Sequence, residues 1–128
     1  MVDVRTVTPI LSVRDVDESL AYYVDKLGFA DPWCWGEPSE FGGVRAGAFE
    51  IFFCKDYQGQ PGTWIAINVG DVDVLFTDLT QRGADVRQPP TNFEWGMREM
   101  NVRDPDGHRI RFGTPTEAPA DGVPFVPE

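Results

Sequence analysis

The sequence predicts an α+β fold made of two similar halves, each containing a strand, a helix and several further short strands. Three observations predict it. The segments ILSVRDVDESLAYYVDKLGF (residues 10–29) and AINVGDVDVLFTDLTQRGA (residues 66–84) share the pattern Val-x-Asp-Val-Asp, which indicates an internal repeat. Each copy changes from the alternating period of a strand to the period of a helix. Strand-like stretches with turn residues between them follow each copy, including DPDG at residues 104–107.

The predicted strand that opens each copy has one apolar face, because side chains alternate along a strand. In the first strand this face carries Val7, Pro9, Leu11 and Val13, and the opposite face carries Thr6, Thr8, Ile10 and Ser12. In the second copy it carries Ile65, Ile67 and Val69, and the opposite face carries Trp64, Ala66 and Asn68. We expect the apolar faces to pack under the helices and leave the mixed faces uncovered.

An aspartate begins each predicted helix and a glycine ends it. Asp15 and Asp71 are 56 positions apart, and Gly28 and Gly83 are 55 apart, so the copies differ by one residue. Aspartate accepts hydrogen bonds from the first N–H groups of a helix, and glycine tolerates the conformation that ends one. We therefore interpret Asp15 and Asp17 as helix-start residues rather than as a catalytic pair of carboxylates.

Antiparallel strands are expected in Trp33–Cys54 of the first half and in Val86–Phe112 of the second. The DPDG sequence predicts a hairpin that joins the stretch before it to the stretch that begins at His108. Beyond Thr114, the prolines and polar residues predict a surface extension or a frayed end.

These elements predict a single domain over residues 1–116, made of halves at about 4–58 and 62–114, with a C-terminal tail at 117–128. A sheet of about four strands with one helix has one uncovered face, so two such halves are expected to curve together around their mixed faces. The result is a cup, and a concavity of that kind is the expected site.

Composition limits the partners. The chain has 128 residues, 41% of them hydrophobic, which suits one domain with a real core. Its formal net charge of −10 argues against nucleic acid and anionic membranes and favours a cationic ligand, although it also serves solubility. The sequence contains neither a signal-peptide pattern nor a long apolar run, so we expect a cytoplasmic protein. Cys34 and Cys54 show no CxxC spacing, which predicts buried thiols and no zinc site or disulfide.

Two strings, TPILSVRDVDESLAYYVDKLGF and WGMREMNVRDPDGHRIRFGT, together with the repeat, resemble the vicinal oxygen chelate superfamily of glyoxalases, bleomycin resistance proteins and extradiol dioxygenases. The resemblance covers roughly Val4 to Thr114. It implies two βαβββ modules that form a curved mixed sheet around a cup, usually assembled as a homodimer.

Enzymes of that superfamily usually bind a divalent metal through His and Glu at four positions. The resemblance assigns these positions to Thr8, Glu50, Trp64 and Arg111. Only Glu50 is a good ligand, because tryptophan offers no lone pair and arginine brings a fixed positive charge. We therefore expect no metal, no cofactor and no catalytic residue. His108 is expected to face away from the cup as a surface or helix-packing residue.

Within the superfamily, WGMRE at 95–99 and RDPDG at 103–107 most resemble the metal-free bleomycin resistance proteins. These proteins sequester a cationic glycopeptide drug in clefts at a dimer interface, stacking it on aromatic side chains. The candidate ligand-binding residues are aromatic, pocket-lining or charged positions: Trp33, Phe41, Glu50, Phe52, Cys54, Trp64, Phe93, Trp95 and Arg111. Each aromatic residue also fits a core or interface role. Arg111 fits either a ligand carboxylate or an ion pair with Glu50 across the cup.

We therefore expect a homodimeric antibiotic-resistance-type protein that sequesters a hydrophobic or cationic small molecule, such as a bleomycin-like glycopeptide, without metal or chemistry. The alternative is a metal-dependent superfamily enzyme, such as a lyase, isomerase or dioxygenase, that uses Glu50. A third reading is a protein–protein module whose aromatic residues serve only assembly. Metal content separates the first two functions, and a cup that takes no ligand would indicate the third.

Overall fold

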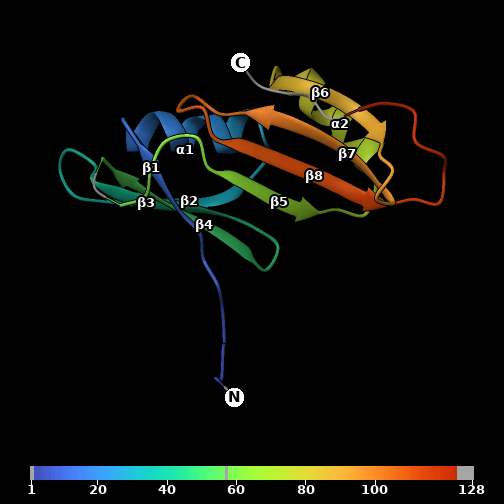
Figure 1. The fold of residues 1–128 in the computed structure, drawn as a ribbon. Helices are drawn as coiled ribbons and strands as arrows, with labels where there is room; N and C mark the ends of the chain where they lie inside the picture. Colours follow the sequence, from blue (N-terminus) through green and yellow to red (C-terminus); the bar gives the residue numbers. More distant parts are fainter. Residues whose placement is uncertain (1, 57, 124–128) are drawn as a thin grey trace. The chain divides into compact units, whose positions relative to one another are not determined.

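The computed structural model describes residues 2–56 and 58–123. The chain divides into two compact units, residues 1–61 and 62–128. The first unit contains a β-α-β-β-β series, shown in Figure 1: β1 (Ile10–Val13), α1 (Val16–Asp25), β2 (Ala30–Trp35), β3 (Phe41–Ala46) and β4 (Phe49–Lys55). Its four strands form one sheet in the order β1-β4-β3-β2, in which only β1 and β4 are parallel.

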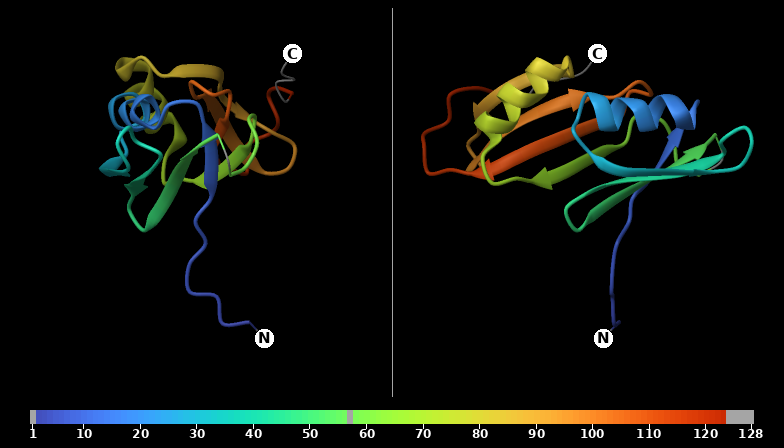
Figure 2. Two further views of the ribbon diagram at one scale, coloured as in Figure 1. Left: turned by 90° about the vertical axis from the view of Figure 1, so that its left-hand side faces the viewer. Right: turned by 180° about the vertical axis from the view of Figure 1, so that it is seen from behind.

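The second unit repeats this order with β5 (Trp64–Asn68), α2 (Val72–Arg82), β6 (Asp85–Asn92), β7 (Met97–Arg103) and β8 (Arg109–Pro115). Its sheet has the order β5-β8-β7-β6, again with the first and last strands of the series parallel. Within each unit the helix lies across one face of its own sheet (Figure 2). The predicted α+β fold of two βαβββ modules is therefore confirmed, with a separate four-stranded sheet in each unit.

Both helices begin at the predicted aspartates. The Asp15 carboxylate accepts a hydrogen bond from the Glu18 N–H at 3.0 Å, and the Asp71 carboxylate accepts from the Asp73 and Val74 N–H groups at 3.0 and 3.1 Å. Each carboxylate satisfies N–H groups that have no partner inside the helix.

The helix ends differ between the copies. Gly83 caps α2 in the left-handed conformation with φ 82°, as predicted. In the first copy Lys26 is the cap residue, and Gly28, with φ 76°, follows two positions later. The buried side chain of Leu27 occupies the position between them.

The core of each unit lies between its sheet and its helix. In the first unit the buried side chains include Leu11, Val13, Tyr23, Val44, Ile51 and Phe53. In the second they include Val72, Leu79, Met100, Val102, Ile110 and Phe112. The predicted apolar face of the first strand is correct for Leu11 and Val13, whereas Val7 is exposed because β1 begins only at Ile10. Pro9 precedes that first residue, where its missing N–H interrupts no ladder bond.

The predicted DPDG hairpin is present between β7 and β8. Gly107 donates its N–H to the Asp104 carbonyl at 3.1 Å, and Asp104 donates to the His108 carbonyl at 2.9 Å. The Asp104 carboxylate also accepts from the N–H groups of Asp106 and His108, both at 2.9 Å. The turn fixes the register of the two strands, so that Arg103 lies opposite Arg109.

The described part of the predicted tail follows β6, the outer strand of the second sheet. Asp121 and Asn92 exchange backbone and side-chain hydrogen bonds, including Asn92 N–H to the Asp121 carboxylate at 2.7 Å. Gln88 donates its side-chain amide to the Val123 carbonyl at 3.0 Å. Residues 124–128 of the predicted tail lie outside the described residues.

The predicted single domain over 1–116, its internal boundaries and the cup between its halves stay predictions, because each unit is described by itself. Among the described residues, no helix is long and apolar enough to cross a membrane.

Candidate functional site

The face of the second sheet that is turned away from α2 carries polar and aromatic side chains. Along β8, Ile110 and Phe112 are buried on the helix side, and Arg109 and Arg111 alternate with them on the open side. Trp64, at the start of the parallel neighbour β5, is 46% exposed. The alternation of strand residues thus brings cationic and aromatic groups to one surface.

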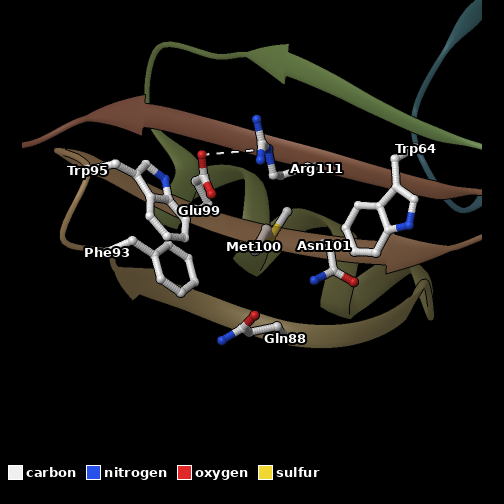
Figure 3. A pocket seen from close by; sticks show the side chains of 8 residues that line it. All are labelled: Trp64, Gln88, Phe93, Trp95, Glu99, Met100, Asn101 and Arg111. Atoms are coloured by element: carbon white, nitrogen blue, oxygen red, sulfur yellow. Dashed lines mark ion pairs between the residues drawn. The ribbon is translucent and has the colours of Figure 1, made fainter. Parts of the chain in front are cut away.

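A pocket of about 100 Å³ lies on this face, and we call it the second-unit pocket. Its lining residues come from β5, β6, β7, β8 and the β6–β7 turn: Trp64, Gln88, Phe93, Trp95, Glu99, Met100, Asn101 and Arg111. Figure 3 shows Trp95 and Phe93 at one end and Trp64 at the other, with the polar side chains between them. Four of the predicted ligand-binding residues therefore lie together here.

Trp95 lies in the turn between β6 and β7 and is stacked on Phe93. The ring centroids are 4.7 Å apart and the rings are inclined by only 9°. Phe93 is 4% exposed, whereas Trp95 is 48% exposed. Gly96, with φ 82°, donates its N–H to the Phe93 carbonyl at 3.2 Å and closes the turn. A buried ring thus supports an exposed one that presents a flat apolar surface.

One arginine, Arg111, lines the polar part of the pocket, and a second, Arg109, lies beside it. Arg111 Nε lies 3.6 Å from an oxygen of Glu99, whose side chain is almost fully buried. Arg109 is 8% exposed, donates to the Asn101 Oδ1 at 3.0 Å and lies 5.6 Å from the centre of the Trp64 ring. Burial lowers the pKa of the Arg109 guanidinium, and the neighbouring charges of Arg87 and Arg103 lower it further.

The first unit gathers another set of predicted residues, which we call the first-unit aromatic cluster: Trp33, Phe41 and Phe52. Their ring centroids lie 5.4 to 5.8 Å apart in pairs. Glu50 accepts a hydrogen bond from the Trp33 indole N–H at 3.4 Å and pairs with Arg45 at 3.5 Å. The rings therefore fill space against one another, and the carboxylate already has partners.

Gly43 explains why Trp33 can adopt this position. The two residues are paired across β2 and β3, and a Cβ on Gly43 would lie 2.7 to 2.9 Å from atoms of the indole. The absence of a side chain lets the indole lie against the strand. The segment 30–40, whose conformation the sequence does not predict, is β2 followed by a turn.

The remaining sequence predictions need correction at several positions. Cys34 is exposed rather than buried, because every residue of the outer strand β2 is exposed; Cys54 is fully buried in β4, as predicted for a thiol. Burial keeps Cys54 from contacting a ligand in this conformation. Of the two roles expected for His108, the surface role is wrong and a packed role remains, because the residue is fully buried and its Nδ1 accepts the Thr63 N–H at 3.0 Å.

Within its own unit, Arg111 lies beside Glu99, and in the other unit Glu50 lies beside Arg45. Glu99 comes near Arg111 because β7 and β8 are neighbouring antiparallel strands. A pair between Arg111 and Glu50 across the cup stays a prediction.

The strand register also corrects the expected metal positions. Ile10 pairs with Phe52 and Ala66 pairs with Arg111, and Ile10 and Ala66 occupy the same place before their helix caps. The first-unit counterpart of Arg111 is therefore Phe52, not Glu50. With Thr8 and Trp64 this set offers no carboxylate and no imidazole, so it does not fit a divalent metal. Within residues 2–56 and 58–123, no three His, Cys, Asp or Glu side chains group to hold a metal ion.

Sequence reasoning missed Gln88, Glu99, Met100 and Asn101 in the pocket. The hairpin carried a signal for two of them. Once Arg103 is placed opposite Arg109 by the DPDG turn, antiparallel counting sets Asn101 opposite Arg111 and Glu99 opposite Gly113.

Comparison with known proteins gives a family match and a fold match. A family model described as the Glyoxalase/Bleomycin resistance protein/Dioxygenase superfamily matches residues 5–112. No curated protein matches the sequence. Among solved structures, TioX from Micromonospora sp. ML1 has a TM-score of 0.75 at 23% identity, covering 86% of this chain and 98% of that chain.

The bleomycin-binding protein from bleomycin-producing Streptomyces verticillus, solved as a complex with copper(II)-bleomycin, has a TM-score of 0.72 at 27% identity. The match covers 91% of this chain and 100% of that one. A glyoxalase/bleomycin resistance protein/dioxygenase from Nocardioides has a TM-score of 0.73 at 18% identity, covering 98% of this chain and 93% of that chain.

Proposed function

The chain belongs to the glyoxalase/bleomycin resistance protein/dioxygenase superfamily, and from that premise we propose that it sequesters a hydrophobic or cationic small molecule without a metal ion and without converting it. The observation that carries the proposal is that Trp64 and Arg111, which stand at two positions where the family resemblance implies metal ligands, both line the pocket on the open face of the second sheet. An indole nitrogen has no free lone pair, and a guanidinium repels a cation.

Exposed aromatic surface supports binding rather than a purely structural role. Trp64 and Trp95 are each about half exposed although they line a pocket. The buried ring of Phe93 stacks on the inner face of the Trp95 indole. Burying an indole against a flat ligand removes apolar surface from water and aligns two π-systems. A solved structure with 27% identity is a bleomycin-binding protein, which supports a small molecule as the ligand class.

The second-unit pocket is too small to enclose a drug-sized ligand by itself. At about 100 Å³ the second-unit pocket is smaller than the roughly 300–1,000 Å³ of typical drug-sized sites. We therefore propose that a second copy of the chain completes the site, so that the ligand lies in a cleft of a homodimer.

Isothermal titration with metal-free bleomycin and with copper(II)-bleomycin tests the proposal, after the protein's own metal content has been measured. We expect binding at micromolar concentration or tighter, weakened about 5- to 150-fold in Trp95→Ala because stacking on one aromatic residue is worth roughly 1–3 kcal/mol. Val74→Ala, which removes an exposed apolar side chain from α2 of the same unit, is the matched control and should bind as the unaltered chain does.

The same titration with Zn²⁺, Ni²⁺ and Mn²⁺ tests the alternative of a metal-dependent enzyme. Tight uptake of one ion per site that is lost in Glu50→Gln would contradict the proposal. Unchanged bleomycin affinity in Trp95→Ala would show that the second-unit pocket is not the binding site. The absence of any binding, together with a monomeric chain, would contradict the proposal as a whole.

A further inference from the structure

The donors in the second-unit pocket have fixed directions. Asn101 lines the pocket, and its Oδ1 accepts from Arg109. Because a guanidinium can only donate, the oxygen of this amide must be the end that faces Arg109. The NH₂ end of Asn101 is therefore the opposite end, which Figure 3 shows directed toward the middle of the pocket.

Arg111 supplies a second set of donors beside this amide. Its Nε is the atom nearest Glu99, at 3.6 Å, which is longer than a strong charge-assisted hydrogen bond. Its side chain is 45% exposed, so the terminal nitrogens remain open to a ligand. Asn101 and Arg111 are directly paired across β7 and β8 and both line the pocket, with the guanidinium turned toward Glu99 and the amide on the side of Gln88 (Figure 3).

The local charge of this face is opposite to that of the whole chain. Glu99 and Arg111 are the charged residues among those that line the pocket, and the buried cation of Arg109 lies beside it, against Asn101 and Trp64. The chain as a whole carries a formal net charge of −10. Two guanidinium groups next to one carboxylate therefore give an anionic group a favourable local field on an otherwise acidic protein.

The walls and the volume restrict the rest of the ligand. Trp64 lies at one end of the pocket and the Phe93–Trp95 stack at the other (Figure 3). A volume of about 100 Å³ is smaller than the dry cavity of roughly 150 Å³ that binds benzene, so a ring would enter this pocket only in part.

We propose that the second-unit pocket receives an aromatic ring that carries a carboxylate, with the carboxylate on the Arg111 guanidinium and the ring against one of the two exposed indoles, Trp64 or Trp95. The inference rests on the proposed binding function, and for this pocket it selects an aromatic acid in place of a cationic group. Guanidinium binds a carboxylate through two parallel N–H···O bonds, which an alcohol or an ammonium group cannot accept in the same way.

Three probes that share one ring system test the charge preference by isothermal titration: 2-naphthoate, 2-naphthalenemethanol and 2-naphthylmethylammonium. We expect 2-naphthoate to bind about tenfold or more tightly than the neutral alcohol, because a hydrogen bond to a charged partner is worth more than a neutral one. We expect the ammonium probe to bind most weakly. The preference for 2-naphthoate should decrease as salt concentration rises.

Arg111→Gln should abolish this preference while leaving affinity for the alcohol within about twofold, and Arg111→Lys should retain part of it because the charge remains without the planar fork. Arg82→Gln is the matched control, since it removes one positive charge from the same unit at the end of α2 and should keep the full preference. Thermal unfolding of each variant checks that the chain is folded.

Tighter or equal binding of the ammonium probe would overturn the inference and leave the proposed sequestration standing. The same holds if Arg111→Gln keeps the full preference for 2-naphthoate. If none of the three probes binds, the inference also fails. The bleomycin titration tests the proposed function separately.

Discussion

The first-unit aromatic cluster and the second-unit pocket are built on the same β-α-β-β-β frame and differ in what occupies the open face. In the first unit, Phe52 stands where the second unit has Arg111, and its ring packs against Trp33 and Phe41. In the second unit, the arginine leaves a polar middle between separated aromatic walls. The comparison teaches that the repeat preserves the frame, while single positions on the open face decide whether rings fill the surface or leave a pocket.

The largest expected effect on the free energy of unfolding comes from removing one phenylalanine ring from each unit, Phe93 in the second and Phe52 in the first. Phe93→Ala should lower the free energy of unfolding by about 3 kcal/mol, because Phe93 is 4% exposed and supports Trp95. Phe52→Ala should cost less, about 1–2 kcal/mol, since Phe52 is only half-buried. Urea unfolding measures both. Equal losses would mean that the two clusters are equally integral to their units.

A smaller effect is expected at the glycine that accommodates Trp33. Gly43→Ala should lower the free energy of unfolding by about 1 kcal/mol, because the new methyl group displaces the indole from β3 and from Glu50. The matched change Gly70→Ala, at a position where a Cβ meets nothing within 4 Å, should stay within roughly 0.5 kcal/mol. Denaturation and tryptophan fluorescence measure the pair. A Gly43→Ala variant as stable as Gly70→Ala would contradict this account of the cluster.

The smallest expected effect concerns the ion pair that joins β7 to α2 in the second unit. Arg98 donates to both carboxylate oxygens of Asp73 at 2.8 and 2.9 Å, and this hydrogen bonding lowers the pKa of Asp73 below its usual value. A carboxyl group with a lowered folded pKa stabilises the fold above about pH 4 and loses that contribution as pH falls through the folded value. Because the Asp73 side chain is 57% exposed, we expect well under about 1 kcal/mol.

Unfolding of the unaltered chain and of Asp73→Asn between about pH 5 and pH 3 measures this contribution. The stability difference between the two should shrink as the pH falls. Asp17→Asn, at the corresponding position of α1, is the matched control for loss of a helix-start charge. A difference that grows toward low pH would contradict the assigned sign.

The frame of both units could be predicted from sequence because its signals are local. The capping aspartates, Gly83 and the DPDG turn each depend on neighbouring backbone groups, and the structure confirms all of them. The exceptions also have local causes. Pro9 delays the start of β1, and the first helix ends at Lys26 before its glycine.

The site was less predictable because it depends on which strands become neighbours. Trp64, Phe93, Trp95 and Arg111 were found through strand alternation and family resemblance, and the structure brings them to one pocket. Asn101 was missed, although the hairpin register places it opposite Arg111. The hydrogen bond of His108 was missed as well, since its partner, the Thr63 backbone, lies 45 positions away in the sequence.

The C-terminal segment at residues 121–123 has a consequence for aggregation. The outer strand of a sheet presents unpaired N–H and C=O groups on which another chain can add a strand. Asp121 hydrogen-bonds to both the backbone N–H and the backbone C=O of Asn92 in β6, so this part of the edge is already occupied by the protein itself. A chain shortened before Asp121 would expose these two groups next to the apolar ring of Trp95. We therefore expect such a shortened chain to be more prone to strand addition beside the second-unit pocket.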